Sequence, residues 1–321
     1  MAYNYLCLDD EPPSTVGPLL DNITDEIEDY ITIEHKYPES FEDQLQLVKD
    51  LAKNGNIEGL IIDLRLDLTP PSWLDSEVAG ELRKPKYRAM ALAQEIRTQS
   101  AEKKFAKEIP IILWSYEDRL RKSYMTDDTG HDLFDLKIKK EDLKDLEEAS
   151  SAGEQLISLV KGYETILNAR ARKGGPGTQF HKFVGLEDDS LLDPRIMSYF
   201  EGHETPIPAH EYARFIIQQL LDVPGPLISE NLLAARLGIS IPRSEDEDWA
   251  SLKAAVSEKA AYVGPFSTGW PRWWARRVED WWSDLSGTPN RLRRLEAEMR
   301  VKHLRQATGL SGLEAAAPLE E

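Results

Sequence analysis

The feature that most limits the fold of this chain is an alternation of short apolar runs and helical patterns in its first half. Five runs have the length and apolar content of strands, at residues 3–8, 30–35, 59–62, 109–114 and 133–138. Helical patterns separate them, and SFEDQLQLVKDLAKNG is complete, with Ser40 as N-cap and Gly55 after the last turn. Because parallel strands need such crossovers, the sequence predicts an α/β domain with a parallel five-stranded sheet covered on both faces.

Polar side chains follow four of these runs, at the points where the strands should end. In open sheets of this kind, ligands bind at the carboxyl ends of the strands, so these residues are expected to meet at one edge. They are Asp9, Asp10 and Glu11 after the first run, Asp63 after the third, Ser115 after the fourth, and Lys139 or Lys140 after the fifth. Clustered carboxylates repel one another unless they hold a hard cation, and Mg²⁺ is the cation predicted here.

These segments resemble the receiver domain of two-component response regulators. YLCLDDEP resembles the family's first strand with its acidic pair, and GLIIDLRLD resembles its third strand with the phosphoacceptor. IPIILWS and FDLKIKKEDL resemble its fourth strand with a hydroxyl residue and its fifth strand with a lysine. The resemblance covers roughly residues 1–150, and it implies a flavodoxin-like fold.

The resemblance also implies a chemistry. Asp63 would accept a phosphoryl group from the phosphohistidine of a histidine kinase or phosphotransfer protein. Asp9 and Asp10 would hold Mg²⁺ together with Asp63 and the main-chain carbonyl of Arg65. Phosphorylated Asp63 would then recruit Ser115 and the lysine, which changes the surface that a partner meets. Pairing of two copies through the last strand and helix is a further expectation drawn from the family.

The sequence departs from the receiver pattern in several places. The motif selects Lys140 as the pocket lysine, whereas a shift of one residue would select Lys139. Glu141 stands where the family has a proline. Gly17 and Pro18 fall where the first helix should run, which predicts a short or late helix because both residues are costly in a helix interior.

Charge and cysteine content limit the function classes. A formal net charge of −18 argues against general binding to nucleic acid or anionic membranes. The single cysteine, Cys7, has no partner for a disulfide, which suits a reducing compartment. No run approaches the roughly 20 apolar residues of a membrane span, and the first residues lack a signal-peptide pattern. A cytoplasmic protein is therefore expected.

The second half of the chain has a different composition. The predicted organisation is a receiver-like domain with an extended last helix at residues 1–172, a linker at 173–180, and a helical domain at 181–321. Six of the eight tryptophans lie between Trp249 and Trp282, and residues 265–310 carry nine Lys or Arg against five Asp or Glu. The tryptophans indicate either an aromatic core or a surface that binds another protein.

Two other function classes, a DNA-binding regulator and an enzyme, have less support in the sequence. GPLISENLLAARLGIS resembles the start of a helix-turn-helix, but an acidic segment, IPRSEDEDWASL, follows where a recognition helix should be basic or polar. No nucleophile elbow, phosphate-binding loop or dinucleotide fingerprint occurs, so no enzymatic output domain is predicted. The sequence favours a Mg²⁺-dependent phosphoacceptor that controls a helical protein-binding domain. The alternatives are a receiver-like scaffold without phosphotransfer in a multi-protein assembly, such as one for cellular defence, and a DNA-binding regulator.

Overall fold

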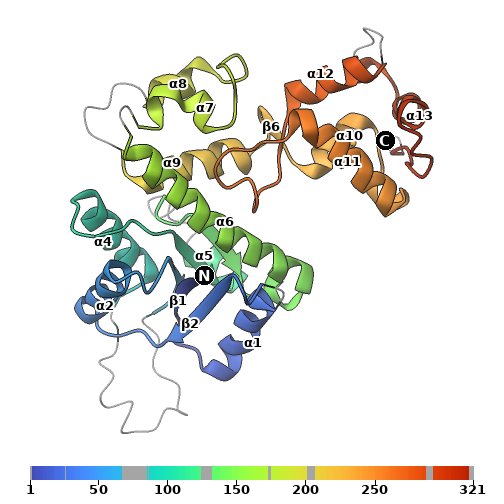
Figure 1. Cartoon of the computed structure of the whole chain (residues 1–321). Helices are drawn as coiled ribbons and strands as arrows, with labels where there is room; N and C mark the ends of the chain where they lie inside the picture. The colour runs from blue at the N-terminus through green and yellow to red at the C-terminus, as the bar shows by residue number, and fades with distance from the viewer. Residues whose placement is uncertain are drawn as a thin grey trace. The chain divides into compact units, whose positions relative to one another are not determined.

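The computed structural model describes residues 2–25, 27–66, 85, 87–123, 132–172, 175–200, 207–286 and 292–317. The chain forms two compact units, one made of Met1–Gly175 with Glu204–Phe215 and the other of Pro176–His203 with Ile216–Glu321. The first unit contains the main sheet, and the second is mainly helical (Figure 1). Residues 204–215 thus group with the first unit although they follow the predicted linker, and no sequence pattern indicated this return.

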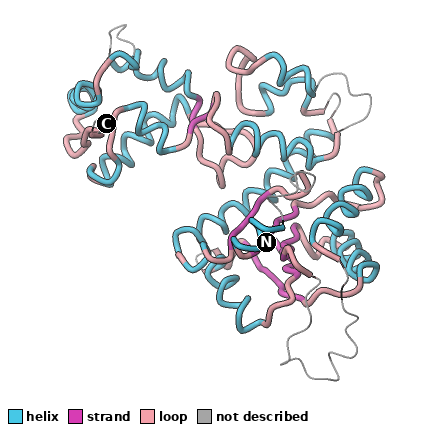
Figure 2. The backbone as a smooth tube through the Cα atoms, turned by 180° about the vertical axis from the view of Figure 1, so that it is seen from behind, coloured by secondary structure: helices cyan, strands magenta, loops and turns pink. Residues whose placement is uncertain are grey.

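The first unit is built on five parallel strands, which run side by side in Figure 2. They are β1 (Tyr3–Leu8), β2 (Ile31–Lys36), β3 (Gly59–Asp63), β4 (Ile111–Ser115) and β5 (Leu136–Lys139). Their order in the sheet is β2-β1-β3-β4-β5. This order is the one found in flavodoxin-like doubly wound sheets. The point at which the strand order reverses, called the topological switch point, lies between β1 and β3. The predicted α/β class and five-stranded parallel sheet are confirmed.

Helices cover both faces of this sheet. The helices of the first unit are α1 (Pro13–Thr24), α2 (Phe41–Lys53), α4 (Ala89–Ala101), α5 (Glu117–Ser123), α6 (Leu146–Arg170) and α9 (Ala209–Arg214). Leu6 and Leu8 of β1 face the apolar cluster that includes the inner sides of α2 and α4. The alternate residue Tyr5 points to the other face, where its hydroxyl donates to the carbonyl of Leu156 in α6. Successive side chains of β1 therefore pack into two different cores, one on each face of the sheet.

Helix α1 differs from the prediction. It runs without interruption from Pro13 to Thr24 and includes Pro18, so the prediction of a short or late helix was wrong. Its buried side chains are Val16, Leu19, Leu20 and Ile23. The packing of this face offsets the one hydrogen bond that Pro18 cannot donate. At Gly153 of α6, an added Cβ would lie 2.6 Å from the carbonyl oxygen of Ile23, so glycine permits the close approach of α1 and α6.

The second unit has a short antiparallel pair, β6 (Leu227–Ile228) and β7 (Trp273–Trp274), among helices. The helices are α7 (Phe180–Phe183), α8 (Pro194–Phe200), α10 (Glu230–Leu237), α11 (Asp246–Ala260), α12 (Ala275–Ser286) and α13 (Ala297–Thr308), with a π-helical segment at Phe215–Leu221. Ser229 caps α10, and Gly238 ends it with φ of 78°. Helix α12 begins only at Ala275, because Trp273 and Trp274, which precede it, pair with β6.

The tryptophans of the second unit form its core. Five of the six between Trp249 and Trp282 are buried, and Trp281 is partly buried. Trp249, Trp273 and Trp282 pack in one cluster with aliphatic residues of α10, α11 and α13, such as Leu237, Leu252 and Leu304. A surface for a partner would therefore have to be formed mainly by other side chains. Over the described residues, no helix has both the length and the apolar content needed to cross a membrane.

Candidate functional site

The site lies at the carboxyl edge of the main sheet, where β1 and β3 end. Leu8 of β1 pairs with Ile62 of β3, so the residues that follow, Asp9 and Asp63, lie at the same level of adjacent strands. Both carboxylates are fully buried. The parallel register thus brings together two acidic side chains that are 54 positions apart in the sequence, as predicted from the strand ends.

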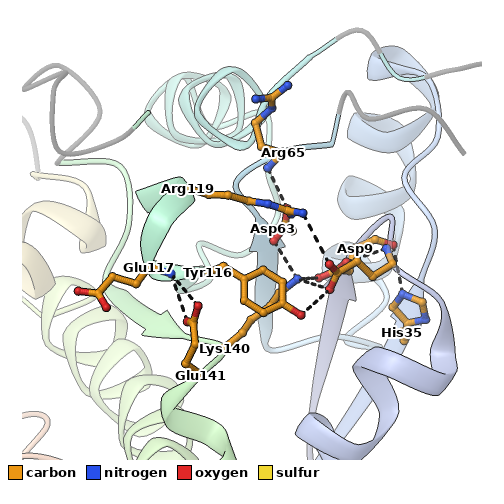
Figure 3. A network of polar contacts seen from close by, with 10 residues as sticks. Asp9, His35, Asp63, Arg65, Tyr116, Glu117, Arg119, Lys140 and Glu141 are labelled. Carbon is orange, nitrogen blue, oxygen red and sulfur yellow. Dashed lines mark hydrogen bonds and ion pairs between the residues drawn. The ribbon is translucent and has the colours of Figure 1, made fainter. Parts of the chain in front are cut away.

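A lysine ammonium bridges these two carboxylates (Figure 3). Nζ of Lys140 lies 2.7 Å from Oδ2 of Asp9, 3.0 Å from Oδ1 of Asp63 and 3.0 Å from Oε2 of Glu11. Lys140 directly follows β5, and β4 lies between β5 and β3 in the sheet, so its side chain crosses the end of β4. The ammonium lies 4.9 Å from the ring centroid of Trp114, which provides a cation–π contact along the way.

The two lysines that the sequence left open occupy different places. Lys140 is fully buried in the site. Lys139 is 41% exposed, and its ammonium lies 3.6 Å from Oε1 of Glu117 in α5. Lys140 is therefore the lysine of this pocket.

Four polar atoms at the site are buried and have no hydrogen-bond partner. They are Oδ1 of Asp10, Oδ1 of Asp63, Oγ of Ser115 and Nη1 of Arg119. Oδ1 of Asp63 does face the Lys140 ammonium at 3.0 Å, but that ion pair lacks hydrogen-bond geometry. A buried polar atom without a partner costs about 1–3 kcal/mol. Two of these four atoms are acceptors, which suit a cation, and two are donors, which suit anionic oxygens. Their proximity is typical of a site for a cation together with an anionic group.

The peptide unit of Arg65 lies beside the phosphoacceptor candidate. Its N–H donates to Oδ2 of Asp63 at 2.9 Å (Figure 3), and this bond holds one carboxylate oxygen in place. The predicted ligand was the carbonyl of the same residue, and this prediction remains open. Residues 67–84, which follow, lie outside the described part of the chain.

Several residues of the site were missed in the sequence. Tyr116 was not expected there: its hydroxyl donates to Oε2 of Glu11 at 3.3 Å, and the same carboxylate oxygen accepts from Lys140. Arg119 projects from the first turn of α5, with Nη1 3.7 Å from Oδ2 of Asp63 and Nη2 3.7 Å from Oε1 of Glu11. Its position four residues after Ser115, in a helix that starts at the strand exit, is the signal that could have identified it.

Two further contacts hold the rim of the site (Figure 3). The backbone N–H of Glu117 donates to both carboxylate oxygens of Glu141, at 3.2 and 3.1 Å, so Glu141 fixes the start of α5. Nε2 of His35 donates to the carbonyl of Asp9 at 3.1 Å. These contacts position Arg119 on one side and the Asp9 backbone on the other.

Two carboxyl groups of the site, those of Asp9 and Asp10, have raised pKa values. Burial, with the nearby charge of Asp63, raises the pKa of Asp9 to about 7, although Lys140 opposes the shift. The same two causes, burial and Asp63, raise the pKa of Asp10 to about 6. Burial alone would lower the pKa of Lys140, but the charges of Asp63 and Asp9 outweigh it, so the net shift is upward. The charge of Asp63 thus favours the protonated forms of Asp9 and Asp10, and the same carboxylate favours the charged form of Lys140.

The donor set fits a divalent cation. If Asp9, Asp10, Glu11 and Asp63 are all ionised, four negative charges face the two positive charges of Lys140 and Arg119. The excess of two negative charges matches one divalent ion. Among the described residues, no three acidic, histidine or cysteine side chains are already gathered around one point as a metal site. Mg²⁺ needs only one or two carboxylates and keeps several waters, so Asp10 and Asp63, whose Oδ1 atoms accept no hydrogen bond, would be the residues that hold it.

Replacing Asp10 with asparagine is expected to stabilise the metal-free protein at pH 7.5, because it removes a carboxylate whose ionisation is unfavourable in the folded state. The expected gain in the free energy of unfolding is about 1 kcal/mol, because solvent screens part of this cost at a half-exposed group. The pKa of about 6 in the folded protein lies above 3.8, the ordinary value of an aspartate. The folded carboxyl therefore binds its proton more tightly, and its ionisation costs stability as the pH rises from about 4 through 6. The gain should thus vanish near pH 4.

Urea unfolding in a chelator, across this pH range, measures the effect. Asp142→Asn, the same change at an exposed site of the first unit, is the control and should show no such pH trend. Excess Mg²⁺ should stabilise the wild type more than Asp10→Asn. A destabilised Asp10→Asn protein in chelator at pH 7.5 would contradict this electrostatic description.

Comparison with known proteins adds no assignment. No model of a known protein family matches the chain. No curated protein matches it either.

Proposed function

We propose that the first unit is a phosphoacceptor module of the receiver type, in which Asp63 takes up a phosphoryl group in the presence of Mg²⁺. One observation carries the proposal: the buried carboxylate of Asp63 ends β3 beside a lysine ammonium, and unpartnered polar atoms of Asp10, Ser115 and Arg119 lie at the same site. The strand order of the sheet supports it, because ligands of flavodoxin-like sheets bind at this edge.

The proposed step is a simple displacement at phosphorus. A carboxylate oxygen of Asp63 forms a bond to phosphorus, and the bond from phosphorus to the donor's nitrogen or oxygen breaks, with the electron pair leaving on the donor. Phosphoryl transfer asks the protein mainly for positioning and for positive charge at the equatorial oxygens. The ammonium of Lys140 and the guanidinium of Arg119 supply such charge from opposite sides of Asp63. Mg²⁺, when bound, would add charge at the same oxygens.

The unpartnered atoms account for both reactants. Oδ1 of Asp10 would face the cation. Oγ of Ser115 and Nη1 of Arg119 are donors, and a phosphoryl group on Asp63 would give them the acceptors that they lack. Phosphorylation would thus tie the ends of β4 and β5 and the start of α5 more firmly to β3. Those segments are the part of the first unit whose surface we expect to change.

The second unit is the proposed output of this switch, through binding of another protein. Helix α11, which follows the Gly238 turn and the 3-10 segment, begins with Asp246, Glu247 and Asp248. An acidic first turn repels the phosphate backbone of DNA, so protein binding is the better supported output.

A second candidate function is a receiver-like scaffold that is never phosphorylated. The contact that favours it is the ammonium of Lys140, which lies within 3.0 Å of Asp9, Glu11 and Asp63 and so already offsets part of their charge. In that case the pocket would hold the ends of the strands together and would carry no signal.

Incubation of the full-length protein with acetyl phosphate and Mg²⁺ separates the two candidates. We expect intact-protein mass spectrometry to show one added phosphoryl group, removable by hydroxylamine, on the wild type. Asp63→Asn should show none, because an amide is a poor nucleophile, and Asp142→Asn should label like the wild type. An unlabelled wild type, or equal labelling of Asp63→Asn, would reject phosphotransfer and leave the scaffold.

A further inference from the structure

The second unit contains a small cavity that the phosphoacceptor proposal does not use. It has a volume of about 270 Å³ and lies at the start of α12, where Trp274, Ala275 and Arg276 line it. This volume is near the lower limit of pockets that hold small molecules, which is roughly 300 Å³. A small ligand is therefore the appropriate occupant to consider.

The cavity wall carries an excess of positive charge. Arg236, Arg276 and Arg293 line it, and Glu279 is the acidic residue of the lining. Oε1 of Glu279 lies 2.8 Å from Nη2 of Arg293 and 3.4 Å from Nη1 of Arg236, so one carboxylate oxygen is shared by two guanidinium groups. Nε of Arg276 lies 3.5 Å from Oδ1 of Asp280, so the three cations are paired with only two carboxylates, in a chain whose net charge is −18.

A helix terminus and an unused donor lie at the same place. Helix α12 starts at Ala275, is 12 residues long and has no acidic residue in its first turn. The amino end of such a helix carries partial positive charge and attracts anions. Trp274, which precedes the helix and lines the cavity, is 1% exposed, and its indole N–H is buried without a hydrogen-bond partner. An acceptor oxygen in the cavity would satisfy this donor.

From this juxtaposition we propose that the cavity formed by Trp274, Arg236, Arg276 and Arg293 binds a small molecule through its phosphoryl group. Three guanidinium groups line this one cavity, and guanidinium forks bind phosphate oxygens in pairs. Glu279 holds Arg236 and Arg293 in position while the cavity is empty and competes with the ligand for them. Inorganic phosphate and a sugar phosphate share this chemistry, and the test separates them.

The test uses the full-length protein with ¹⁵N-labelled tryptophan. Titration with ribose 5-phosphate is expected to shift the indole N–H resonance that is missing in Trp274→Phe, and calorimetry gives the affinity. Arg293→Gln should weaken binding about tenfold, the effect of one charge-assisted hydrogen bond. Glu279→Gln should strengthen binding several-fold because it removes the competing charge.

Two further variants, Arg277→Gln and Asp63→Asn, serve as controls for this test. Arg277→Gln removes the same charge from α12 one residue beyond the lining residue Arg276 and should change affinity less than twofold. Asp63→Asn should bind normally, so this site and the phosphoacceptor fail independently. Tighter binding of ribose 5-phosphate than of inorganic phosphate assigns a phosphorylated metabolite, and equal binding assigns free phosphate. No shift at roughly 10 mM of either, an equal effect of Arg277→Gln and Arg293→Gln, or equal binding of acetate would overturn the proposal.

Discussion

Replacing Lys140 with methionine is expected to lower the free energy of unfolding at pH 8 by about 3–5 kcal/mol, as when one partner of a buried ion pair is removed. The ammonium is fully buried between the carboxylates of Asp9 and Asp63, which are also fully buried. Methionine fills a similar volume, so the loss reports mainly the two buried carboxylates that no longer face the ammonium, of which Asp63 keeps only the guanidinium of Arg119 at 3.7 Å. Urea unfolding of the full-length protein, followed by circular dichroism, measures it.

The neighbouring lysine provides a matched control. Lys139→Met makes the same chemical change one residue earlier, at a side chain that is 41% exposed, and should cost less than about 1 kcal/mol. The deficit of Lys140→Met should shrink as the pH falls from 8 to 5.5, because burial raises the pKa of Asp9 and a proton can then replace the missing cation. Equal losses for the two variants at pH 8 would show that the ammonium of Lys140 does not hold the site together.

Arg97→Met is expected to destabilise the first unit by a similar amount, about 3–5 kcal/mol. Arg97 lies in α4 and is only 5% exposed. Its Nη2 lies 2.7 Å from Oδ2 of Asp135, while Nη1 and Nε donate to the carbonyls of Ile109 and Leu133. Asp135 also accepts from the hydroxyl of Tyr163 in α6 at 2.8 Å. Removal of the guanidinium leaves a buried carboxylate and two carbonyls with fewer donors.

Arg121→Met is the control for this prediction. Arg121 lies 3.7 Å from Glu117 on the surface of α5 and is 66% exposed. Exposed pairs of this spacing contribute about 0.3–0.5 kcal/mol, so the loss should be correspondingly small. Chemical denaturation of both variants at pH 7.5 gives the comparison. Similar stabilities would mean that the buried network around Asp135 contributes no more than a surface ion pair.

Local patterns were sufficient for most of the sheet and for part of the site. Strand ends can be read from apolar runs, and a parallel sheet necessarily gathers the residues after those ends, which is why Asp9, Asp63 and Ser115 could be placed at one edge. Ser40 and Gly55 marked α2 correctly because caps act within one turn of the helix. These features depend on neighbours in sequence or on the periodicity of one element.

The features that the sequence did not predict depend on contacts between distant segments. Pro18 has a poor helix propensity, and only the packing of α1 against α6 shows why the helix continues. Arg97 and Asp135 are 38 residues apart and look like two ordinary charges until the fold pairs them. Arg119 belongs to the site only because Glu141 holds the first N–H of α5. Such pairings are set by tertiary geometry, which a single sequence does not reveal.

The placement of β5 between two charged anchors has a consequence for strand register. This edge strand has only four residues, LKIK, and its alternation of apolar and basic side chains is weak information about alignment. Asp135, just before it, bonds to Arg97 and to the N–H of Ile111, and Lys140, just after it, reaches Asp9 and Asp63. A slip of one residue would withdraw both charged groups from their partners at once. The ion pairs at the two ends of β5 therefore favour a single register of β5 on β4. Hydrophobic packing of Leu136 and Ile138 alone would specify this register far less strictly.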